Sequence, residues 1–308
     1  MIESKNLENF KDKYIDEFTD DEEMNDRIKK IKAIAFDLDD TALDGQGRLS
    51  EETREAIIMA AEAGIEPIIA SGRSFYSIPD EISQVPGIRY AICSNGANVF
   101  DTVNRECLSA MFLNPHSVEQ IVKVADDYID TVYLDAFTRG VPHSDRRLLD
   151  TLLSNEKISE HRKKYLRKTR HAEDDIRAFI NEKKLELDCM NYNVFDTELF
   201  EELVGRLQRE VDDIYYTSSL PQLIEISYKD AGKGSGLRSV CKILGLDLSE
   251  VAAFGNADND ADMIRLAGIG YAVSNSSQVA LDAADIVIGP NWDNSVADEI
   301  KRIISIKD

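Results

Sequence analysis

The 308-residue sequence lacks a long apolar run and has little positive charge. No stretch approaches the roughly 20 consecutive apolar residues that cross a bilayer. The N-terminus also lacks a basic segment followed by an apolar one, the pattern of a secretory signal, so we expect a cytoplasmic protein. The formal net charge of −22 disfavours nucleic acid and anionic membranes as partners, because both require a basic surface.

Cysteine is also scarce. The four cysteines lie far apart, at Cys93, Cys107, Cys189 and Cys241, and none forms a C-x-x-C pair. This spacing argues against a zinc site and a disulfide scaffold, and it suits a reducing compartment. Nothing in the sequence indicates the oligomeric state.

The alternation of apolar stretches with helical patterns from Ile31 onward is typical of an α/β fold. It predicts a Rossmann-like parallel sheet covered by helices on both faces. One helix is expected to begin after Ser50, a favourable cap, and to end at Gly64. Strands are expected at residues 31–36, 65–70, 89–94, 222–227, 251–254, 269–273 and 285–289.

Two segments do not follow this alternation. Residues 1–30 are strongly acidic with little apolar periodicity, so we expect a solvated extension, with a docking or regulatory tail as the alternative. The stretch between about residues 97 and 220 is more polar and has longer helical patterns, which indicates an inserted second domain. The predicted division is an acidic extension at 1–30, a discontinuous α/β core at 31–97 and 222–308, and an inserted domain at 98–221.

A cluster of carboxylates follows the first predicted strand in DLDD, Asp37 to Asp40. Side chains alternate along an extended chain, so Asp37 and Asp39 are expected to point one way and Asp40 the other. Two carboxylates at a sheet edge suit Mg²⁺, and a carboxylate can also attack phosphorus to form an acyl phosphate. The alternative is that these acids only form a turn.

Two further motifs suit an anionic ligand. In ASGR, Ser71 and Gly72 follow a predicted strand and leave backbone N–H groups open as a helix begins, although a plain helix cap is the alternative. In AGKGSG, residues 231–236, neither a Walker A loop nor a dinucleotide fingerprint fits. What remains is Lys233 in a flexible loop at a helix start, where it could neutralise a phosphate.

The last motif is GNADNDADM, residues 255–263. Its alternating acids suggest a calcium-binding EF-hand loop, but that loop requires glycine at its sixth position and an acid at its twelfth, where this chain has Met263 and Ile269. An Asn/Asp-rich loop between a buried strand and a helix better fits a metal or phosphate site. Together, the motifs supply two carboxylates, a hydroxyl, a lysine and an acidic loop at one edge of the sheet, which are the groups that phosphoryl transfer uses.

In order and spacing, these motifs resemble the haloacid dehalogenase-like hydrolases, and more narrowly the Cof-type sugar-phosphate phosphatases of that superfamily. The matching stretches are FDLDDT, ASGR, SNGA (residues 94–97), GKG and FGNADNDADMI, which together cover about half of the chain. The resemblance implies that the inserted domain is an α+β cap that closes over the active site and contacts the leaving group of a small phosphorylated metabolite.

The resemblance also implies residue roles. Asp37 would attack phosphorus and become an aspartyl phosphate, while Asp39 would protonate the leaving oxygen and then activate water. Lys233 would screen the charge of Asp37, and the hydroxyl of Ser71 would bond the phosphate. The implied substrate-binding residues are Ser71, Gly72, Arg73, Asn95, Lys233 and Asn259. The implied Mg²⁺ site comprises Asp37, the backbone carbonyl of Asp39, Asn256 and, ordering its shell, Asp260.

Two departures from the family pattern are present. Asp40 replaces a common glycine, and Asn256 replaces a common aspartate, which predicts weaker Mg²⁺ affinity. Two alternatives to a phosphatase remain: a phosphohexomutase that uses the same aspartyl phosphate, and a non-catalytic sensor or partner-binding protein on a phosphatase fold. The latter is motivated by Asn256 and the acidic extension, but Asp37, Asp39, Ser71 and Lys233 favour catalysis.

A basic run, HRKKYLRKTRH, extends from His161 to His171 within the inserted segment. Such a run is usually a solvated helix face. The alternative is that some of its residues reach the cleft and bind a second acidic group of the substrate. In that case, charge reversal at Arg167 and Lys168 should raise KM selectively for bisphosphates or phospho-acids.

Overall fold

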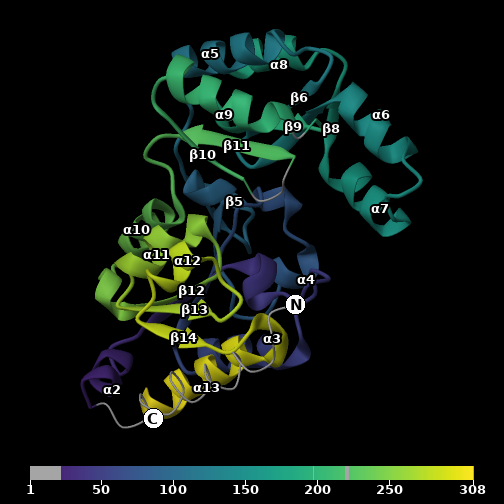
Figure 1. The fold of residues 1–308 in the computed structure, drawn as a ribbon. Coiled ribbons are helices and arrows are strands. Elements are labelled where there is room, and N and C mark those ends of the chain that lie inside the picture. The colour runs from purple at the N-terminus through teal and green to yellow at the C-terminus, as the bar shows by residue number, and fades with distance from the viewer. Residues whose placement is uncertain (1–21, 197, 219–221, 308) are drawn as a thin grey trace.

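The computed structural model describes residues 22–196, 198–218 and 222–307 and contains two sheets (Figure 1). In the larger sheet, the strands from β14 to β3 are parallel, and β4 and β5 extend it as an antiparallel edge. The α/β fold with a parallel-rich sheet is therefore confirmed. The strand order is β14 (Ile286–Ile288), β13 (Ile269–Val273), β12 (Val251–Gly255), β1 (Ala33–Phe36), β2 (Glu66–Ala70), β3 (Tyr90–Cys93), β4 (Asn98–Asp101) and β5 (Glu106–Ala110).

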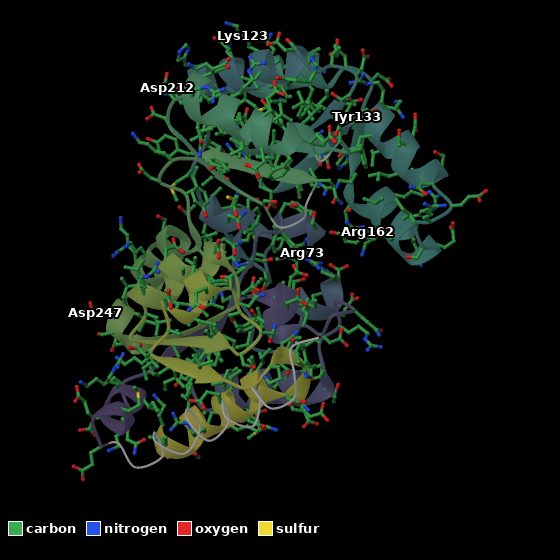
Figure 2. The ribbon with its side chains drawn as sticks, viewed as in Figure 1. Arg73, Lys123, Tyr133, Arg162, Asp212 and Asp247 are labelled. Carbon is green, nitrogen blue, oxygen red and sulfur yellow. The ribbon has the colours of Figure 1, made fainter. Side chains whose placement is uncertain are left out.

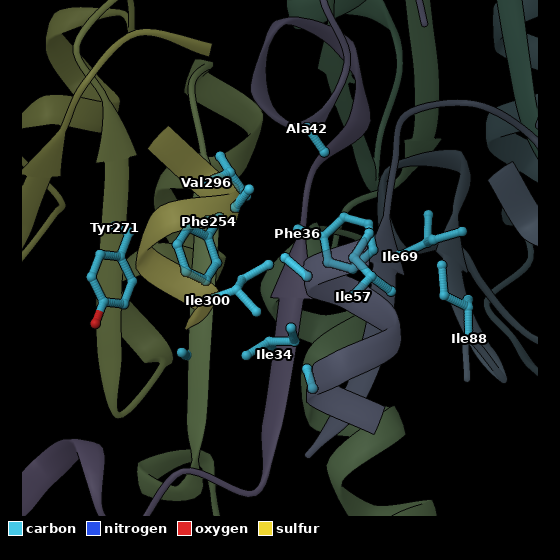
Figure 3. Close-up of a cluster of buried hydrophobic side chains, with 14 of the residues drawn as sticks. Ile34, Phe36, Ala42, Ile57, Ile69, Ile88, Phe254, Tyr271, Val296 and Ile300 are labelled. Atoms are coloured by element: carbon cyan, nitrogen blue, oxygen red, sulfur yellow. The ribbon is translucent and has the colours of Figure 1, made fainter. Parts of the chain in front are cut away.

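The central strand β1 shows why this sheet is covered on both faces. Ile34 and Phe36 pack with α3 (Glu51–Glu62) and α13 (Ser295–Lys307) in the core shown in Figure 3. Ala33 and Ala35 point the opposite way, toward α10 (Lys233–Leu244). The predicted cap of α3 is present, since the Ser50 hydroxyl accepts the backbone N–H of Thr53. No helix in the described part of the chain is long and apolar enough to cross a membrane.

The smaller sheet is mostly antiparallel and lies above the larger one in Figure 1. The helices α5 (Pro115–Asp126), α8 (Ile176–Lys183) and α9 (Glu198–Glu210) cover its upper face. Two helices, α6 (Arg146–Ser154) and α7 (Glu160–Thr169), form an arm at one side. The strand order is β10 (Ile214–Thr217), β11 (Leu223–Tyr228), β9 (Leu187–Val194), β6 (Val132–Thr138), β7 (Val141–Asp145) and β8 (His171–Glu173).

The predicted sheet membership of two segments is wrong. The strand expected in the core at residues 222–227 is β11, which pairs antiparallel with β9 and β10 in the smaller sheet. Its alternation of apolar and polar residues suits a strand with one covered face, whereas a buried parallel strand is apolar throughout. Conversely, β4 and β5 pair with the larger sheet. The boundaries placed at residues 98 and 222 therefore shift to the stretch between β5 and α5 and to the end of β11.

The expected solvated extension at residues 1–30 is also wrong in its last part. Residues 22–28 form a helix, α2 (Glu22–Ile28), whose Met24 and Ile28 are buried in the larger core. These two apolar residues are four positions apart and so lie on one helix face. Arg27 adds hydrogen bonds to the carbonyl of Gly268 and to the carboxylate of Asp285. Residues 1–21 lie outside the described residues.

Candidate active site

The candidate site lies at the carboxyl ends of neighbouring parallel strands. Phe36, the last residue of β1, is in register with Phe254 of β12 and Ile69 of β2. Residues just past these strands therefore meet at one edge of the sheet, where open α/β folds bind ligands. Asp37 follows β1, Ser71 follows β2, and the loop that begins at Asn256 follows β12.

A buried lysine joins two acidic loops. Lys233 Nζ donates to Asp37 Oδ1 at 2.6 Å and to Asp260 Oδ1, and all three side chains are at least 94% buried. Burial raises the pKa of Asp37 to about 7, with Lys233 acting in the opposite direction. Burial alone would lower the pKa of Lys233, but the carboxylates of Asp260 and Asp37 raise it overall. Lys233 is therefore a fixed positive charge inside the site.

The glycines around Lys233 allow close approach rather than flexibility. Helix α10 begins at Lys233 itself, and Gly234 N–H donates to Asp262 Oδ2. A Cβ at Gly96, whose φ is +89°, would lie 1.8 Å from the Gly232 carbonyl oxygen. The prediction of a flexible loop is wrong, because the start of α10 is packed directly against the SNGA loop.

The metal positions suggested by the resemblance are brought together at this edge. Asn256 Oδ1 accepts the Thr41 hydroxyl at 3.0 Å. Asp260 Oδ2 accepts the backbone N–H groups of Asn256 and Ala257, so Asp260 holds their loop rather than offering a free carboxylate. In the described part of the chain, no three His, Cys, Asp or Glu residues cluster as a metal site. One carboxylate, one amide and one carbonyl oxygen nevertheless fit Mg²⁺, which keeps several waters and often binds substrate phosphate.

The expected phosphate-binding residues form a second cluster. Ser71 is fully buried, and its backbone carbonyl accepts the backbone N–H of Asn95 at 3.2 Å. A Cβ at Gly72 would lie 3.0 Å from Asn95 Oδ1, and that oxygen accepts Asn259 Nδ2 at 2.8 Å. Asn95 has a left-handed backbone (φ 51°), which asparagine tolerates better than most residues. Three loops far apart in sequence are thus joined.

Asp39 is held by an arginine at the mouth of the site. Arg73 donates two hydrogen bonds to the Asp39 carboxylate, at 2.9 and 2.6 Å. Arg73, expected to bind substrate, is therefore bonded to the expected acid–base residue. The other two acids of the cluster lie in the outgoing loop: Asp40 is exposed, and Asp44 accepts backbone and guanidinium groups of Arg48.

The lower face of the smaller sheet carries a polar row. Residues directly opposite in antiparallel pairs share a face, and the alternate residues pack against the helices above. Tyr215 of this lower face is within electrostatic reach of Lys233 and Asp262, since both charges affect its pKa, which burial raises. The row therefore faces the site. It consists, strand by strand, of Ser144, Asp135, Asn191, Glu225 and Thr217.

The arm reaches the same region from the side. The Tyr165 hydroxyl of α7 donates to the Ser77 carbonyl of the core at 2.8 Å. Figure 2 shows Arg162, also from α7, on the side of the arm nearest Arg73. The basic run suggested Arg167 and Lys168 as substrate contacts. In the structure, Lys168 forms an ion pair with Asp80, and Arg167 is exposed.

The fold and this arrangement define an α/β protein with a buried aspartate–lysine centre at the carboxyl edge of a parallel sheet. The family profile of haloacid dehalogenase-like hydrolases matches residues 34–300, and the chain belongs to that family. It is 27% identical to the phosphatase YwpJ of Bacillus subtilis, over 89% of this chain and all of that protein. It is 25% identical to the 5-amino-6-(5-phospho-D-ribitylamino)uracil phosphatase YcsE of the same organism, over 88% of this chain and 95% of the relative.

A solved structure of a haloacid dehalogenase-like hydrolase from B. subtilis superimposes with a TM-score of 0.73 at 25% identity, covering 88% of this chain and 99% of that one. The expected family membership is confirmed, and the protein is a hydrolase whose curated relatives include phosphatases.

Two residues of the site were not predicted from the sequence. Thr41 orients the Asn256 amide, and Asp262 holds the start of α10 through Gly234. Thr41 stands directly after DLDD, and Asp262 lies inside the GNADNDADM motif, so their positions in the sequence could have indicated that both belong to the site. Neither contact could be inferred, because each joins residues more than 25 positions apart.

Proposed function

We propose that the protein is a Mg²⁺-dependent phosphatase of small phosphomonoesters that works through an aspartyl phosphate on Asp37. The observation that carries this proposal is the buried contact of Lys233 with Asp37 and Asp260 beside the Ser71–Asn95–Asn259 cluster. A fixed cation and several neutral donors at one sheet edge suit a phosphate dianion better than a neutral substrate.

The first half-reaction consumes the carboxylate of Asp37. An oxygen of Asp37 forms a bond to phosphorus while the bond from phosphorus to the leaving oxygen breaks. Lys233 holds Asp37 Oδ1, which leaves Oδ2 for attack or for a cation. Asp39 gives its proton to the leaving alcohol.

The second half-reaction restores the enzyme. Asp39 takes a proton from water, whose oxygen attacks phosphorus and releases inorganic phosphate and the Asp37 carboxylate. A proton on Asp39 would compete with the two hydrogen bonds from Arg73, so Asp39 must turn from Arg73 before acting as an acid. Ser71, Gly72 and Asn259 are positioned to bond the phosphoryl oxygens.

The residues that would hold Mg²⁺ are Asp37, the carbonyl of Asp39 and Asn256, with Asp260 fixing their loop. When bound, the cation would neutralise charge on the phosphate. The polar row under the smaller sheet would hydrogen-bond the leaving group, which supports sugars or related hydroxyl-bearing metabolites as substrates. A cytoplasmic location is part of the proposal, supported by four unpaired cysteines.

The test is a phosphate-release screen over phosphorylated metabolites, with and without Mg²⁺. We expect turnover with Mg²⁺ that is absent in Asp37→Asn and lost on chelation. Product analysis separates the mutase alternative, which would return an isomerised phosphate ester. The non-catalytic alternative would gain support if no phosphomonoester, p-nitrophenyl phosphate included, were hydrolysed faster than by Asp37→Asn.

A further inference from the structure

The inner side of the arm carries an arrangement of arginines that the proposed reaction does not use. Helix α7 turns one face toward the protein, and Leu166 and Thr169 of that face are buried. Arg162 and Tyr165 lie on or beside the same face, at helical spacing. Arg170 follows at the end of the helix.

The guanidinium groups of Arg162 and Arg170 are held against aromatic rings. Arg162 Cζ lies 4.9 Å from the centre of the Tyr165 ring, and Arg170 Cζ lies 5.4 Å from that of Phe137. Phe137 belongs to the lower face of the smaller sheet, two residues from Asp135. Stacking fixes the plane of a guanidinium but leaves its N–H groups available at the edge.

Within residues 22–196, 198–218 and 222–307, these guanidinium groups have no carboxylate partner. Among the residues that the structure describes, neither Arg162 nor Arg170 forms an ion pair, and Arg170 Nη1 is buried with no hydrogen-bond partner. A buried unpaired donor on a charged group is costly, so such a group normally has a ligand or water in the working protein.

Positive charges also converge at this point. Arg162 is exposed as a residue, but partial desolvation of its guanidinium has the largest effect on its pKa and lowers it. The charges of Arg170 and Arg73 lower it further, and those of Tyr165 and Asp39 oppose them. Asp39 already accepts two hydrogen bonds from Arg73. The cluster therefore has more cations than anions, in a protein of net charge −22.

We propose that Arg162 and Arg170, with Arg73, bind a second anionic group, a carboxylate or a second phosphate, on the leaving group of the substrate. This inference rests on the proposed function, since the leaving group is defined by Asp39, which must reach the leaving oxygen. Arg73 bonds Asp39 directly, and Arg162 lies on the side of the arm nearest Arg73 (Figure 2), so an anion bound between the two arginines belongs to the leaving group. An incoming anion would also compete with Asp39 for Arg73 and free that carboxyl for proton transfer.

The test compares substrates that differ only in the second charge. One pair is 3-phosphoglycerate and glycerol 3-phosphate, and the other is fructose 1,6-bisphosphate and fructose 6-phosphate. The first pair tests a carboxylate, the second a phosphate. In at least one pair, we expect kcat/KM to be about tenfold higher for the more anionic ester, mainly through KM.

The variants Arg162→Ala and Arg170→Ala should each reduce this preference by about fivefold or more, with little effect on the less charged ester. Arg162→Lys should keep part of it, since the charge remains while the planar fork is lost. Arg167→Ala is the matched control on the same helix, because Arg167 is five positions from Arg162 and so lies about 140° around the helix from it, and it should leave the preference unchanged.

Equal kcat/KM values within both pairs would overturn the inference, and so would an equal loss for both esters in Arg162→Ala. The proposed function would survive either result, since Mg²⁺-dependent hydrolysis would remain. If no ester were hydrolysed, calorimetry of Asp37→Asn with the same four compounds would decide the question. Equal affinity within each pair, or affinity unchanged by Arg162→Ala, would count against the arginine site independently of catalysis.

Discussion

Arg73 and Asp39 are joined by two hydrogen bonds, of 2.9 and 2.6 Å, across the mouth of the site. The guanidinium holds the proposed acid–base residue in one orientation while the proposed nucleophile, Asp37, lies deeper, against Lys233. Because Arg73 comes from the loop after β2 and Asp39 from the loop after β1, this contact depends on the parallel register of the two strands.

The variant Arg73→Ala tests whether Arg73 acts through Asp39. We expect kcat for alkyl phosphates without a second charge to be kept or to rise, because Asp39 no longer has to leave Arg73 before it protonates the leaving oxygen. Asp39→Asn should instead lower this kcat by about ten- to a hundredfold and affect p-nitrophenyl phosphate, whose leaving group needs no proton, much less. A role of Arg73 in phosphate binding alone would weaken both substrates equally in Arg73→Ala.

Lys233→Met should be the most damaging single change in the core of the site. It would leave Asp37 and Asp260 buried without their cation, at a cost of about 3–5 kcal/mol in the free energy of unfolding. Turnover should also disappear. The matched control is Lys242→Met, because Lys242 is exposed on the same helix. Denaturant unfolding of both variants measures the difference, and equal stability would contradict the contribution assigned to Lys233.

Asn256→Asp should strengthen cation binding. The added carboxylate can still accept the Thr41 hydroxyl, so the local geometry should be kept while one neutral oxygen becomes charged. We expect the dissociation constant for Mg²⁺ to fall by about tenfold, measured by calorimetry without substrate. Asp258→Asn, in the exposed part of the same loop, serves as a control. Unchanged affinity in Asn256→Asp would remove Asn256 from the proposed ligand set.

The stability of the metal-free protein should depend on pH through Asp37. Burial raises the pKa of Asp37 from 3.8 to about 7, so the folded state binds this proton more tightly than the unfolded chain does. The resulting stabilisation is complete below about pH 4 and is lost as the pH rises through about 7. Wild type should therefore lose stability relative to Asp37→Asn over this range, on the order of a few kcal/mol.

Urea unfolding at several pH values in the presence of a chelator would measure this change. Asp44→Asn is the control of opposite sign, because hydrogen bonds from Arg48 lower the pKa of Asp44 to about 2. Its stability difference from wild type should change only below about pH 4. A constant difference between wild type and Asp37→Asn from about pH 4 to 7.5 would argue against a buried, protonated Asp37.

Ile28→Ala tests the packing of α2 on the core. Ile28 is fully buried, so we expect a loss of about 2–5 kcal/mol in the free energy of unfolding. Lys29→Ala, at the exposed neighbouring position, should change stability by less than about 0.5 kcal/mol. If both variants unfolded like wild type, α2 would be dispensable for the stability of the larger core.

Three of the motifs predicted which residues meet at the sheet edge, because each of these three lies directly after a parallel strand. Once β1, β2 and β12 are recognised as parallel, their carboxyl ends must meet, and Asp37, Ser71 and Asn256 follow from position alone. The pairing of Arg73 with Asp39 could not be predicted in this way. The strand pattern places both residues at the same edge but does not set the direction of two long side chains past the strand ends.

The errors had a related cause. The predicted strand at residues 222–227 is placed in the core because it begins a second run of strand–helix alternation, although its alternation of Ile224, Glu225 and Ile226 already indicated a sheet with one covered face. The basic run was similarly ambiguous. Its composition does not distinguish Arg162, which lies on the side of the arm nearest Arg73, from Arg167, which lies about 140° around the same helix.

The sequence by itself determined the α/β alternation, the order of the motifs and the residues at the ends of the strands, because these depend on local apolar periodicity and on parallel pairing. Only the tertiary structure decided which charges face one another. Lys233 reaches Asp37 across 196 positions because glycines let α10 approach the SNGA loop, and Arg162 lies on the side of the arm nearest Arg73 because the arm docks through Tyr165. Such contacts depend on how separate elements pack, which local sequence patterns do not encode.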